Sequence, residues 1–335
     1  MANIAINGLG RIGRAAFKMI LDIPELNLVG VNDLIPADNL AYLLKYDSVY
    51  GRYGRKLSVN KDALVVDGKS IPVYHEKDPT RLPWGKLKVD TVLECTGVFT
   101  KAQDLRKHLQ AGAKNAILSA PAKDEETVTV VHGVNAPSEP LQVISCASCT
   151  TNCITPVMEV MSRRIGVKKA LMTTIHAYTA SQGIVDGPRK KWRRGRAGAA
   201  NLVPTSTGAA IATAKALPEL KGKFDGVAVR APVPVGSIAD IVFLSSRKTS
   251  AEEVNTIFKE EAKSERYDGI LGVAEDPIVS SDIIMDKRAS VVDLEMTQVV
   301  DGDLVKIMTW YDNEWGYTAQ MVREALELSG LSSKL

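Results

Sequence analysis

Three of the four cysteines in this 335-residue chain lie close together, in the segment Ser145-Cys-Ala-Ser-Cys149-Thr-Thr-Asn-Cys153. Cys149 stands at the start of a long helical pattern, so we expect it to be the first residue of a helix. The N–H groups and the partial positive charge of a helix N-terminus stabilise a thiolate, and a neighbouring imidazole can add to this effect. The sequence therefore predicts that Cys149 is a nucleophile with a lowered thiol pKa.

The same cysteines could instead bind a metal or be structural. Their Cys-x2-Cys-x3-Cys spacing superficially resembles an iron–sulfur run, but a cluster normally needs a fourth ligand, and Cys95 is the only other cysteine. A zinc site is disfavoured because no histidine has ligand spacing to these cysteines; the histidines are His75, His108, His132 and His176. We expect no metal, and we expect Cys153, one turn after Cys149, to be buried and structural.

A thiol nucleophile needs a base, and His176 is the candidate. It follows the apolar strand pattern of residues 170–175. A lone histidine at a strand end is more often structural than catalytic, so the need of Cys149 for a base is what favours a catalytic role.

The motif Gly8-Leu-Gly10-Arg-Ile-Gly13 lies between an apolar strand pattern and a helical pattern. In this context the first glycine permits a tight turn, the second lets a pyrophosphate approach the backbone, and the third allows close packing of helix on strand. The helix N-terminus then offers N–H groups to the phosphates. Asp33 ends the second strand, where a carboxylate can accept hydrogen bonds from a ribose and would repel a 2′-phosphate. The motif predicts a dinucleotide site that prefers NAD to NADP.

The elements that must position these residues divide the chain near residue 150. Before it, strand and helix patterns alternate, which predicts a doubly wound parallel sheet of the Rossmann type. We expect strands at 3–7, 26–32, 89–95, 116–119 and 143–145 and helices at 11–21, 38–45 and 101–111. Asp38 should cap the second helix and Thr100 the third, which Gly112 should end. Asp67-Gly68 predicts a hairpin turn.

The second part has fewer helices and more strands, so we expect an α+β domain with a mostly antiparallel sheet. We expect strands at 168–177, 226–230, 238–245, 290–294, 298–300 and 304–311, with a turn at Asp301-Gly302. We expect one helix at 149–165 and a second that begins with the capping box of Ser250 and reaches about residue 265. A last helix should span 314–329 and end at Gly330. The expected domains are an NAD-binding domain, 1–148, onto which the C-terminal helix region 314–335 packs, and a catalytic domain, 149–313.

Composition is that of an ordinary globular protein, with 45% apolar and 24% charged residues. A net charge of +3 is too small to indicate a nucleic-acid or membrane partner by itself. The N-terminus lacks the features of a signal peptide, and no run of 18 apolar residues occurs. With so few cysteines, these features predict a cytoplasmic protein without membrane association.

The chain resembles glyceraldehyde-3-phosphate dehydrogenase over essentially its whole length. The segments that carry the resemblance are Asn7-Gly-Leu-Gly-Arg-Ile-Gly-Arg14, Leu118-Ser-Ala-Pro-Ala-Lys123, Ala147-Ser-Cys-Thr-Thr-Asn-Cys153, His176-Ala-Tyr-Thr179, Pro204-Thr-Ser-Thr-Gly-Ala-Ala210 and Trp310-Tyr-Asp-Asn-Glu-Trp-Gly-Tyr317. The resemblance implies the phosphorylating oxidation of glyceraldehyde 3-phosphate to 1,3-bisphosphoglycerate by a homotetramer. It also implies that Cys149 forms a thioester and that His176 activates it.

The resemblance assigns further residues to binding. NAD would be held by the glycine motif with Arg11, Ile12, Asp33, Lys77 and Ser119, and Asn313 would orient the nicotinamide amide. Thr179 and Arg230 would hold the substrate phosphate. Inorganic phosphate would be held by Ser148, Thr150, Thr207, Gly208 and an arginine of residues 193–196, for which spacing favours Arg194 over Arg196. Thr207-Gly208 also opens a predicted helix, which is a second favourable position for an anion.

Some positions depart from the family pattern without removing a catalytic group. They are Ala180-Ser181 in place of Asn-Asp, Gly187 before Pro188 in place of a bulkier residue, and Ala231-Pro-Val-Pro-Val-Gly-Ser237 in place of Val-Pro-Thr-Pro-Asn-Val-Ser. The Gly187 change bears on the preference for NAD, because that loop is expected near the adenosine ribose of a neighbouring subunit. Within the enzyme class, the alternative is the related dehydrogenase acting on erythrose 4-phosphate, against which the phosphate-pocket residues argue.

The segment Arg189-Lys-Lys-Trp-Arg-Arg-Gly-Arg196 carries six positive charges in eight residues. Alone, such a run suggests nucleic-acid binding or a solvated surface loop. The resemblance adds a third interpretation, which we favour: the loop packs at a subunit interface and supplies one arginine to a phosphate site.

Overall fold

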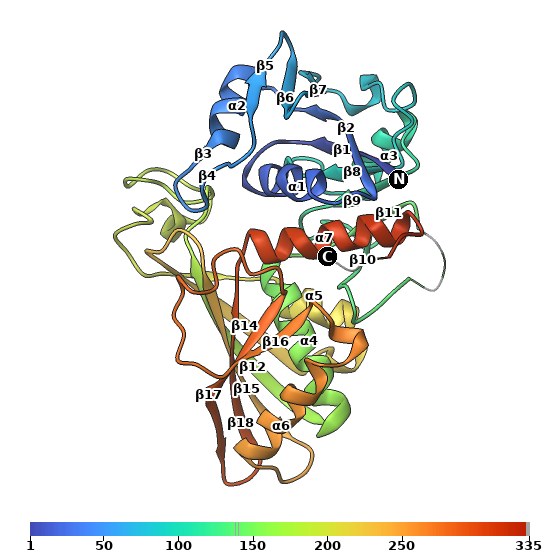
Figure 1. Cartoon of the computed structure of the whole chain (residues 1–335). Helices are drawn as coiled ribbons and strands as arrows, with labels where there is room; N and C mark the ends of the chain where they lie inside the picture. The colour runs from blue at the N-terminus through green and yellow to red at the C-terminus, as the bar shows by residue number, and fades with distance from the viewer. Residues whose placement is uncertain (138, 140, 333–335) are drawn as a thin grey trace. The chain divides into compact units, whose positions relative to one another are not determined.

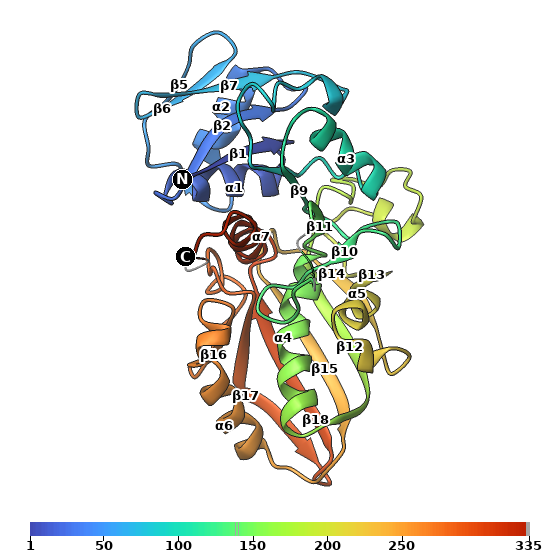
Figure 2. The same ribbon diagram turned by 90° about the vertical axis from the view of Figure 1, so that its right-hand side faces the viewer.

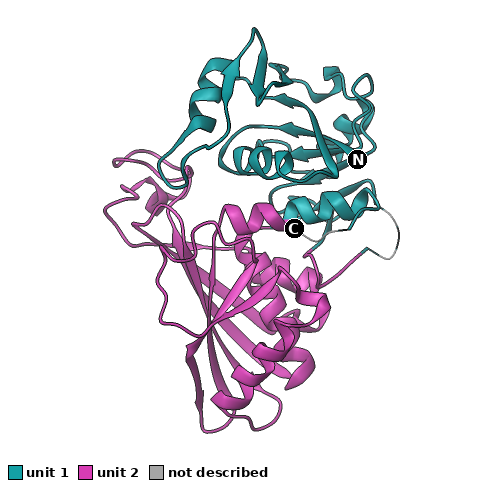
Figure 3. Cartoon of the chain, viewed as in Figure 1, with its two compact units in different colours: residues 1–130, 137–147, 321–335 teal, residues 131–136, 148–320 magenta. Residues whose placement is uncertain are grey.

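The computed structural model describes residues 1–137, 139 and 141–332. The chain forms two compact units, shown in different colours in Figure 3. Unit 1 comprises residues 1–130, 137–147 and 321–335, and unit 2 comprises residues 131–136 and 148–320. Helix α7 (Trp315–Leu328) contributes residues to both units. No helix in the described ranges is long and apolar enough to cross a membrane.

Unit 1 is built on a sheet of nine strands in the order β10-β11-β9-β8-β1-β2-β7-β6-β5 (Figure 1). The strands from β10 to β7 pair in parallel, as the alternating pattern predicts, and only the β7-β6-β5 edge is antiparallel. Their bounds are β1 Ala2–Asn7, β2 Leu26–Asn32, β5 Leu57–Val59, β6 Ala63–Val66, β7 Lys69–Tyr74, β8 Thr91–Glu94, β9 Asn115–Leu118, β10 Val128–Thr129 and β11 Val143–Ser145. A small separate ribbon joins β3 (Tyr46–Asp47) to β4 (Gly51–Arg52).

The helices of this unit are α1 (Arg11–Leu21), α2 (Ala37–Lys45) and α3 (Ala102–Gln110). Both predicted caps are wrong. Pro36 is the N-cap of α2, and Asp38 lies in the first turn, where its charge still favours the helix. Lys101 takes the cap position of α3 in place of Thr100, because the Asp124 carboxylate accepts a hydrogen bond from the N–H of Ala102 at 2.5 Å.

The predicted turns of unit 1 are confirmed. Asp67 and Gly68 both have positive φ between the antiparallel strands β6 and β7. Gly112 follows α3 with a φ of +100°, and a Cβ there would come within 2.5 Å of the Gly85 Cα. Only glycine fits this end of the helix.

Unit 2 contains a seven-stranded sheet in the order β13-β14-β12-β15-β18-β17-β16. Its pairings are antiparallel except for β12–β14 and β16–β17, so the prediction of a mostly antiparallel sheet is confirmed. The strands are β12 Val167–Ala177, β13 Val203–Ser206, β14 Phe224–Ala231, β15 Ser237–Ser245, β16 Leu271–Ala274, β17 Ser290–Val300 and β18 Leu304–Tyr311. The two strands expected at 290–300 are one strand with a register shift, and β13 and β16 were not predicted.

Helices α4 (Cys149–Arg164), α5 (Ala209–Ala216) and α6 (Ala251–Glu261) cover one face of this sheet, and Figure 2 shows α4 lying along the strands. Buried apolar side chains of α4, such as Val157 and Met161, form one core with β15, β17 and β18. Ser250 caps α6 by accepting the N–H of Glu253, as its capping box predicts, although the helix ends at Glu261 rather than near 265. This core fixes the start of α4, where Cys149 lies.

The middle of α4 is tied to the rest of unit 2 by the Glu159 carboxylate. It accepts hydrogen bonds from Arg163 and Arg266, each at 2.9 Å, and from the hydroxyl of Tyr267. Burial raises the pKa of Glu159, but the arginines and the tyrosine outweigh it and hold the pKa below its usual value. A carboxyl with a lowered folded-state pKa stabilises the fold above its unfolded pKa, and this stabilisation is lost as the pH falls through the folded value.

We therefore expect Glu159→Gln to lower the free energy of unfolding of the protein by about 2 kcal/mol at pH 7. The difference from the parent should shrink as the pH falls through the lowered pKa of Glu159, because the parent carboxyl then becomes protonated as well. Urea unfolding at a series of pH values measures it. The matched control is Glu260→Gln, which removes the exposed pair with Arg164 and should leave the midpoint nearly unchanged. A pH-independent loss in Glu159→Gln would contradict the electrostatic explanation.

Candidate active site

The glycine motif of unit 1 has the backbone geometry that its sequence predicts. Gly8 has a φ of +94°, and a Cβ there would come within 2.7 Å of the Thr96 nitrogen, while a Cβ on Gly13 would collide with the Gly8 oxygen at 1.9 Å. In contrast, nothing lies within 4 Å of the position where Gly10 would carry a Cβ. Gly10 is the N-cap of α1, and no side chain caps that helix. The second glycine thus faces open space at a helix N-terminus, the arrangement that suits a pyrophosphate.

A cavity of about 410 Å³ adjoins this loop. The predicted residues Gly8, Gly10, Asp33 and Lys77 line it. The other residues around it, which sequence reasoning missed, include Ile35, Thr96, Val98 and Phe99. Residues 96–99 follow β8, the neighbour of β1 on the side opposite β2, where the order of parallel strands reverses. Ligands bind at such a reversal, so the connection after the 89–95 strand pattern was the signal for the missed residues.

Asp33 is held at the end of β2 by two backbone donors. Its carboxylate accepts the N–H of Leu9 at 2.7 Å and the N–H of Ile35 at 3.0 Å. These contacts fix an anionic group on the cavity wall beside the glycine loop. The carboxylate fits the hydroxyls of a ribose and repels a phosphate on the same sugar.

We expect Asp33→Asn to raise the affinity for NADP relative to NAD by about tenfold, since it removes the charge and keeps an oxygen that can accept the Leu9 N–H. Calorimetric titration with each dinucleotide measures the two dissociation constants. Asp38→Asn, an exposed change in the next helix, is the control and should leave the ratio unchanged. If the ratio of the NADP and NAD dissociation constants is unchanged in Asp33→Asn, Asp33 does not contact the ribose.

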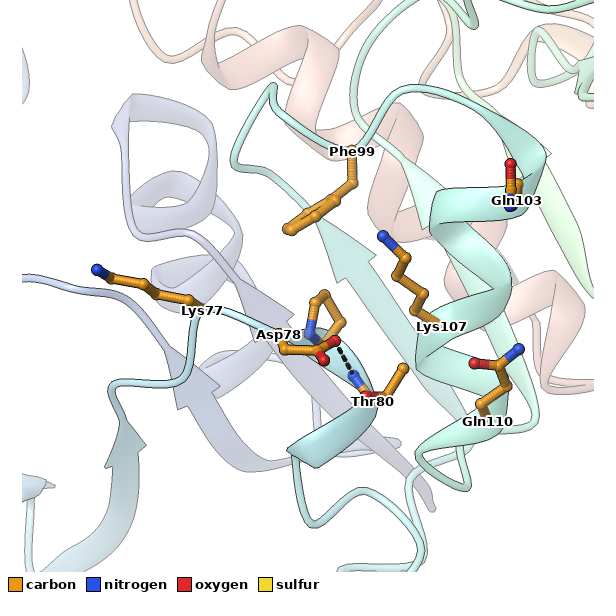
Figure 4. Close-up of a pocket in the computed structure, with 8 residues that line it drawn as sticks. Lys77, Asp78, Thr80, Phe99, Gln103, Lys107 and Gln110 are labelled. Atoms are coloured by element: carbon orange, nitrogen blue, oxygen red, sulfur yellow. Dashed lines mark hydrogen bonds between the residues drawn. The ribbon is translucent and has the colours of Figure 1, made fainter.

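The remaining predicted cofactor residues of this unit do not line the cavity. The Arg11 side chain is paired with Asp47 at 2.6 Å and lies over the Tyr50 ring, so Arg11 and Ile12 can reach a phosphate only through the backbone of α1. Ser119 follows β9, and its N–H bonds to the Glu94 oxygen. Lys77 also borders a second cavity beside α3, in which Phe99 and Lys107 lie close together (Figure 4).

Cys149 is the first residue of α4, as predicted, and Ser148 is the N-cap, accepting the N–H of Thr151 at 3.1 Å. The Cys149 sulfur lies 3.3 Å from Nε2 of His176, which stands near the end of β12. Burial raises the pKa of the Cys149 thiol, while Arg230 and hydrogen bonds at the helix start lower it. In the chain alone burial prevails, so the lowered thiol pKa predicted from the helix start is wrong here. The thiol proton must then pass to the adjacent imidazole during attack.

His176 is buried and faces Arg230 on its other side. Its Nδ1 lies 2.7 Å from the oxygen of Ala177 and 2.6 Å from Nη1 of Arg230, which also bonds to that oxygen at 3.0 Å. Burial, followed by the charge of Arg230, lowers the pKa of His176 to about 3. The imidazole is therefore neutral at pH 7, the form in which a histidine can accept a proton.

Arg230 is a half-buried cation without a carboxylate partner among the described residues. Its Nε is buried and has no hydrogen-bond partner in the same part of the chain. Burial lowers the pKa of the Arg230 guanidinium, and the nearby charge of Arg194 lowers it further. Two neighbouring guanidinium groups without a counter-charge are unfavourable unless an anion joins them. The arrangement fits a phosphorylated substrate.

The other predicted phosphate residues lie on loops of the same unit. Thr207 and Gly208 directly precede α5, which begins at Ala209, so the predicted helix start is confirmed. Arg194 donates to the Thr205 hydroxyl at 3.1 Å, whereas Arg196 is paired with Asp186 at 2.6 Å. The geometry favours Arg194 as the phosphate ligand, because Arg196 already has a carboxylate partner.

Three predicted hydroxyls are engaged within the chain. Ser148 bonds to the Thr151 hydroxyl and Thr179 to the Ser181 hydroxyl, both at 2.8 Å, and Thr150 lies 3.0 Å from the Tyr311 hydroxyl. Ser148 and Thr179 are partly exposed, whereas the Thr150 side chain is buried. Thr150 therefore faces the core in this structure, and a phosphate could reach its backbone N–H more directly than its hydroxyl.

Sequence reasoning missed Tyr311. This buried side chain bonds to Thr150 and, at 2.7 Å, to Thr174, and the His176 ring packs against it edge-on with centroids 5.9 Å apart. It thereby connects the start of α4 with β12 and orients the imidazole. Asn313, the predicted nicotinamide ligand, follows β18 in the same unit and is also buried.

Comparisons with known proteins agree with the geometry. Residues 2–102 match the family model "Glyceraldehyde 3-phosphate dehydrogenase, NAD binding domain", and residues 148–313 match "Glyceraldehyde 3-phosphate dehydrogenase, C-terminal domain". Glyceraldehyde-3-phosphate dehydrogenase 2 of Streptomyces avermitilis is 50% identical over 323 residues, which cover 95% of this chain and 96% of the relative. Glyceraldehyde-3-phosphate dehydrogenase 1 of Bacillus subtilis is 49% identical and the enzyme of Geobacillus stearothermophilus 48%, with the same coverage.

Proposed function

The chain belongs to the glyceraldehyde-3-phosphate dehydrogenase family, and we propose that it oxidises glyceraldehyde 3-phosphate through a thioester on Cys149, yielding 1,3-bisphosphoglycerate with inorganic phosphate and reducing NAD. The observation that carries the proposal is the 3.3 Å contact between the Cys149 sulfur and His176, beside the guanidinium of Arg230, which has no carboxylate partner among the described residues. A nucleophile, a neutral base and a half-buried cation together suit a phosphorylated aldehyde.

NAD would be held by the residues around the glycine motif, and when bound it accepts the hydride from the substrate carbon. The binding residues in this proposal are Gly8, Gly10, Arg11, Ile12, Gly13, Asp33, Lys77 and Ser119, with Asn313 on the nicotinamide amide. The open space at Gly10 and the carboxylate of Asp33 are the features that fit the pyrophosphate and the ribose. We assign no metal to the reaction.

The two phosphate groups would use different residues. Thr179 and Arg230 hold the phosphate of the substrate, and the attacking inorganic phosphate is held by Ser148, Thr150, Arg194, Thr207 and Gly208. Arg194 and Arg230 are close enough for the charge of one to lower the pKa of the other. Bound anions offset this repulsion between the two guanidinium groups.

In the first half of the reaction the Cys149 sulfur adds to the aldehyde carbon, and its proton passes to Nε2 of His176. The protonated imidazole and the N–H groups at the start of α4 stabilise the oxyanion, which takes up the proton as a hemithioacetal. His176 then removes this hydroxyl proton while the carbon is oxidised to the thioester. In the second half, a phosphate oxygen attacks the thioester carbon, the carbon–sulfur bond breaks, and the thiolate is regenerated.

Arg230 links substrate binding to the state of the base. A guanidinium only donates hydrogen bonds, so its 2.6 Å contact requires Nδ1 of His176 to be an acceptor and places the ring proton on Nε2, facing the sulfur. When a substrate phosphate draws Arg230 away, Nδ1 can donate to the Ala177 oxygen instead. Nε2 then presents its lone pair to the thiol, so the base is formed when the phosphorylated substrate binds.

Steady-state kinetics with NAD and NADP, each with and without inorganic phosphate, tests the proposed function. We expect turnover that requires phosphate and prefers NAD. A rate independent of phosphate would indicate an acid-forming aldehyde dehydrogenase and overturn the acyl-phosphate product. A higher kcat/KM for erythrose 4-phosphate than for glyceraldehyde 3-phosphate would favour the related dehydrogenase.

The proposal includes a homotetramer acting in the cytoplasm. In unit 2, Leu171 of β12 is 66% exposed, and it borders a cavity lined by residues of β12, β14 and β15 together with Ile211 of α5. On the basic segment 189–196, Trp192 is 86% exposed. Exposed apolar groups of this size are typical of subunit interfaces. Analytical sedimentation should give four times the mass of one chain. A separate titration with RNA at physiological salt tests the basic segment, and binding there would support a nucleic-acid partner.

A further inference from the structure

Ser237 is the first residue of β15, and its buried hydroxyl lies between the strand end that carries His176 and the side chain of Asn313. We infer that Ser237 is a positioning residue that fixes the amide orientation of Asn313 and the backbone next to His176 with one hydroxyl. The part of this inference that concerns the cofactor rests on the proposed role of Asn313 in holding the nicotinamide amide.

The hydrogen bonds around Ser237 allow a single assignment. The N–H of Ala177 lies 3.1 Å from the Ser237 oxygen and must be the donor of that bond. The hydroxyl has one proton, which it can give to Oδ1 of Asn313 at 2.9 Å. The chain of donors therefore runs from Ala177 through Ser237 to Asn313.

A second donor reaches the same amide oxygen from the residue before Ser237. The N–H of Gly236 lies 3.2 Å from Oδ1 of Asn313. Gly236 has a φ of +91°, and a Cβ there would come within 2.2 Å of the Ser280 oxygen, so this turn requires glycine. The segment before Ser237, in which this chain departs from the usual family pattern, thus supplies its own contact to Asn313.

Two donors on Oδ1 decide which way the amide of Asn313 faces. If the amide were flipped, its NH₂ group would face the N–H of Gly236, which only donates, and that hydrogen bond would be lost in a buried place; the Ser237 hydroxyl would have to turn and accept instead. Nδ2 of Asn313 is therefore kept as the donor for a ligand. A carboxamide oxygen, such as that of the nicotinamide amide, is the complementary acceptor.

The other end of the chain of donors acts on the catalytic pair. Ala177, whose N–H is bound by Ser237, offers its carbonyl oxygen to Nδ1 of His176 and to Arg230. Ser237 thus holds the N–H of the residue whose carbonyl oxygen, one peptide further on, is a shared contact of the imidazole and the guanidinium. One hydroxyl connects the placement of the cofactor amide with the placement of the base.

The test compares two ligands that differ in the nicotinamide. Calorimetric titration of Ser237→Ala is expected to show about tenfold weaker binding of NAD than the parent, the loss typical of one buried hydrogen-bond partner, and unchanged binding of ADP-ribose, which lacks the nicotinamide. General damage to the fold would weaken both ligands alike. Equal loss for both ligands, or no loss for either, would overturn the inference.

Two further variants of the same strand complete the comparison. Ser245→Ala removes a buried hydroxyl at the far end of β15, which bonds to the backbone oxygens of Arg247 and Asp303, and it should bind both ligands as the parent does. Ser237→Thr keeps the hydroxyl and should recover most of the NAD affinity. Failure of Ser237→Thr to recover it, in a variant that still binds ADP-ribose normally, would count against the hydroxyl as the cause.

Asn313→Ala separates failure of this inference from failure of the proposed function. If Asn313→Ala leaves NAD and ADP-ribose binding unchanged, the proposed role of Asn313 is wrong. If Asn313→Ala weakens NAD alone but Ser237→Ala does not, only the role of Ser237 is wrong. The inference requires that Ser237→Ala add no further loss of NAD affinity when Asn313 is already alanine.

A readout without cofactor tests the effect on the catalytic pair. Because Ser237→Ala releases the N–H of Ala177, and thereby loosens the residue whose carbonyl oxygen contacts His176 and Arg230, we expect the alkylation rate of Cys149 by iodoacetamide at pH 7 to change at least threefold. We expect Ser245→Ala to match the parent. Equal alkylation rates in the parent and both variants would show that Ser237 acts on Asn313 alone, and they would overturn its proposed connection with His176.

Discussion

Cys149→Ala is expected to lower kcat for the phosphorylating oxidation by about five orders of magnitude, the size of loss typical when a covalent nucleophile is removed. Without the sulfur, no thioester can form, and neither His176 nor Arg230 supplies another nucleophile. The dissociation constant for NAD should change less than threefold, because Cys149 is not among the residues to which NAD binding is assigned and does not line the cavity beside the glycine motif. Stopped-flow absorbance at the NADH band and calorimetric titration measure the two quantities.

Cys153→Ala is the matched control, because it removes a cysteine one turn along the same helix. The Cys153 sulfur is buried against the hydroxyls of Ser290 and Thr309, and burial raises its thiol pKa to about 12. We expect a modest loss of stability, about 1 kcal/mol, and a kcat within a factor of a few of the parent. Appreciable single-turnover thioester formation in Cys149→Ala would refute the mechanism, and equal loss in both variants would assign the effect to packing of α4.

Local patterns predicted most of the fold. Helix α1, strands β2, β11 and β18 and both Asp-Gly turns follow from apolar periodicity and from residues that tolerate positive φ. The errors occur where a distant part of the chain replaces a local signal. Asp124 supplies the acceptor at the start of α3 that Thr100 was expected to provide, and its position 22 residues along the chain from Ala102 leaves no local trace.

The same distinction applies to the candidate site. Cys149 and His176 were predictable because a thiol at a helix start needs a base. The two residues are 27 positions apart in the sequence. Tyr311 and Ser237 were not predicted, because their roles depend on contacts across the sheet: β18 brings Tyr311 against β12, and β15 brings Ser237 beside Ala177. The pKa of Cys149 was misjudged for a similar reason, since burial is a property of the assembled core rather than of the helix start.

His176→Asn is expected to reduce kcat by about a thousandfold, within the range found when a general acid–base group is removed. The variant keeps an amide near the sulfur but no group that accepts its proton at pH 7. In the presence of inorganic phosphate, which draws Arg230 from Nδ1, removal of the imidazole should also slow alkylation of Cys149 by iodoacetamide by ten- to a hundredfold at pH 7, since the thiolate then forms only by loss of its proton to solvent. Rapid-quench kinetics and mass spectrometry of the alkylated chain measure both rates.

The pH dependence of that alkylation shows whether His176 acts as the base. Burial raises the pKa of the Cys149 thiol, so in His176→Asn the thiolate fraction, and with it the rate, should rise tenfold for each pH unit up to that pKa. In the parent, with inorganic phosphate present to draw Arg230 from Nδ1, the imidazole takes the proton, so the rate should rise less steeply and the two proteins should converge in alkali. His108→Gln is the control, because that buried histidine belongs to unit 1, where it bonds to Trp84 and Glu94. Parallel profiles in parent and His176→Asn would show that the 3.3 Å contact orients the sulfur without accepting its proton.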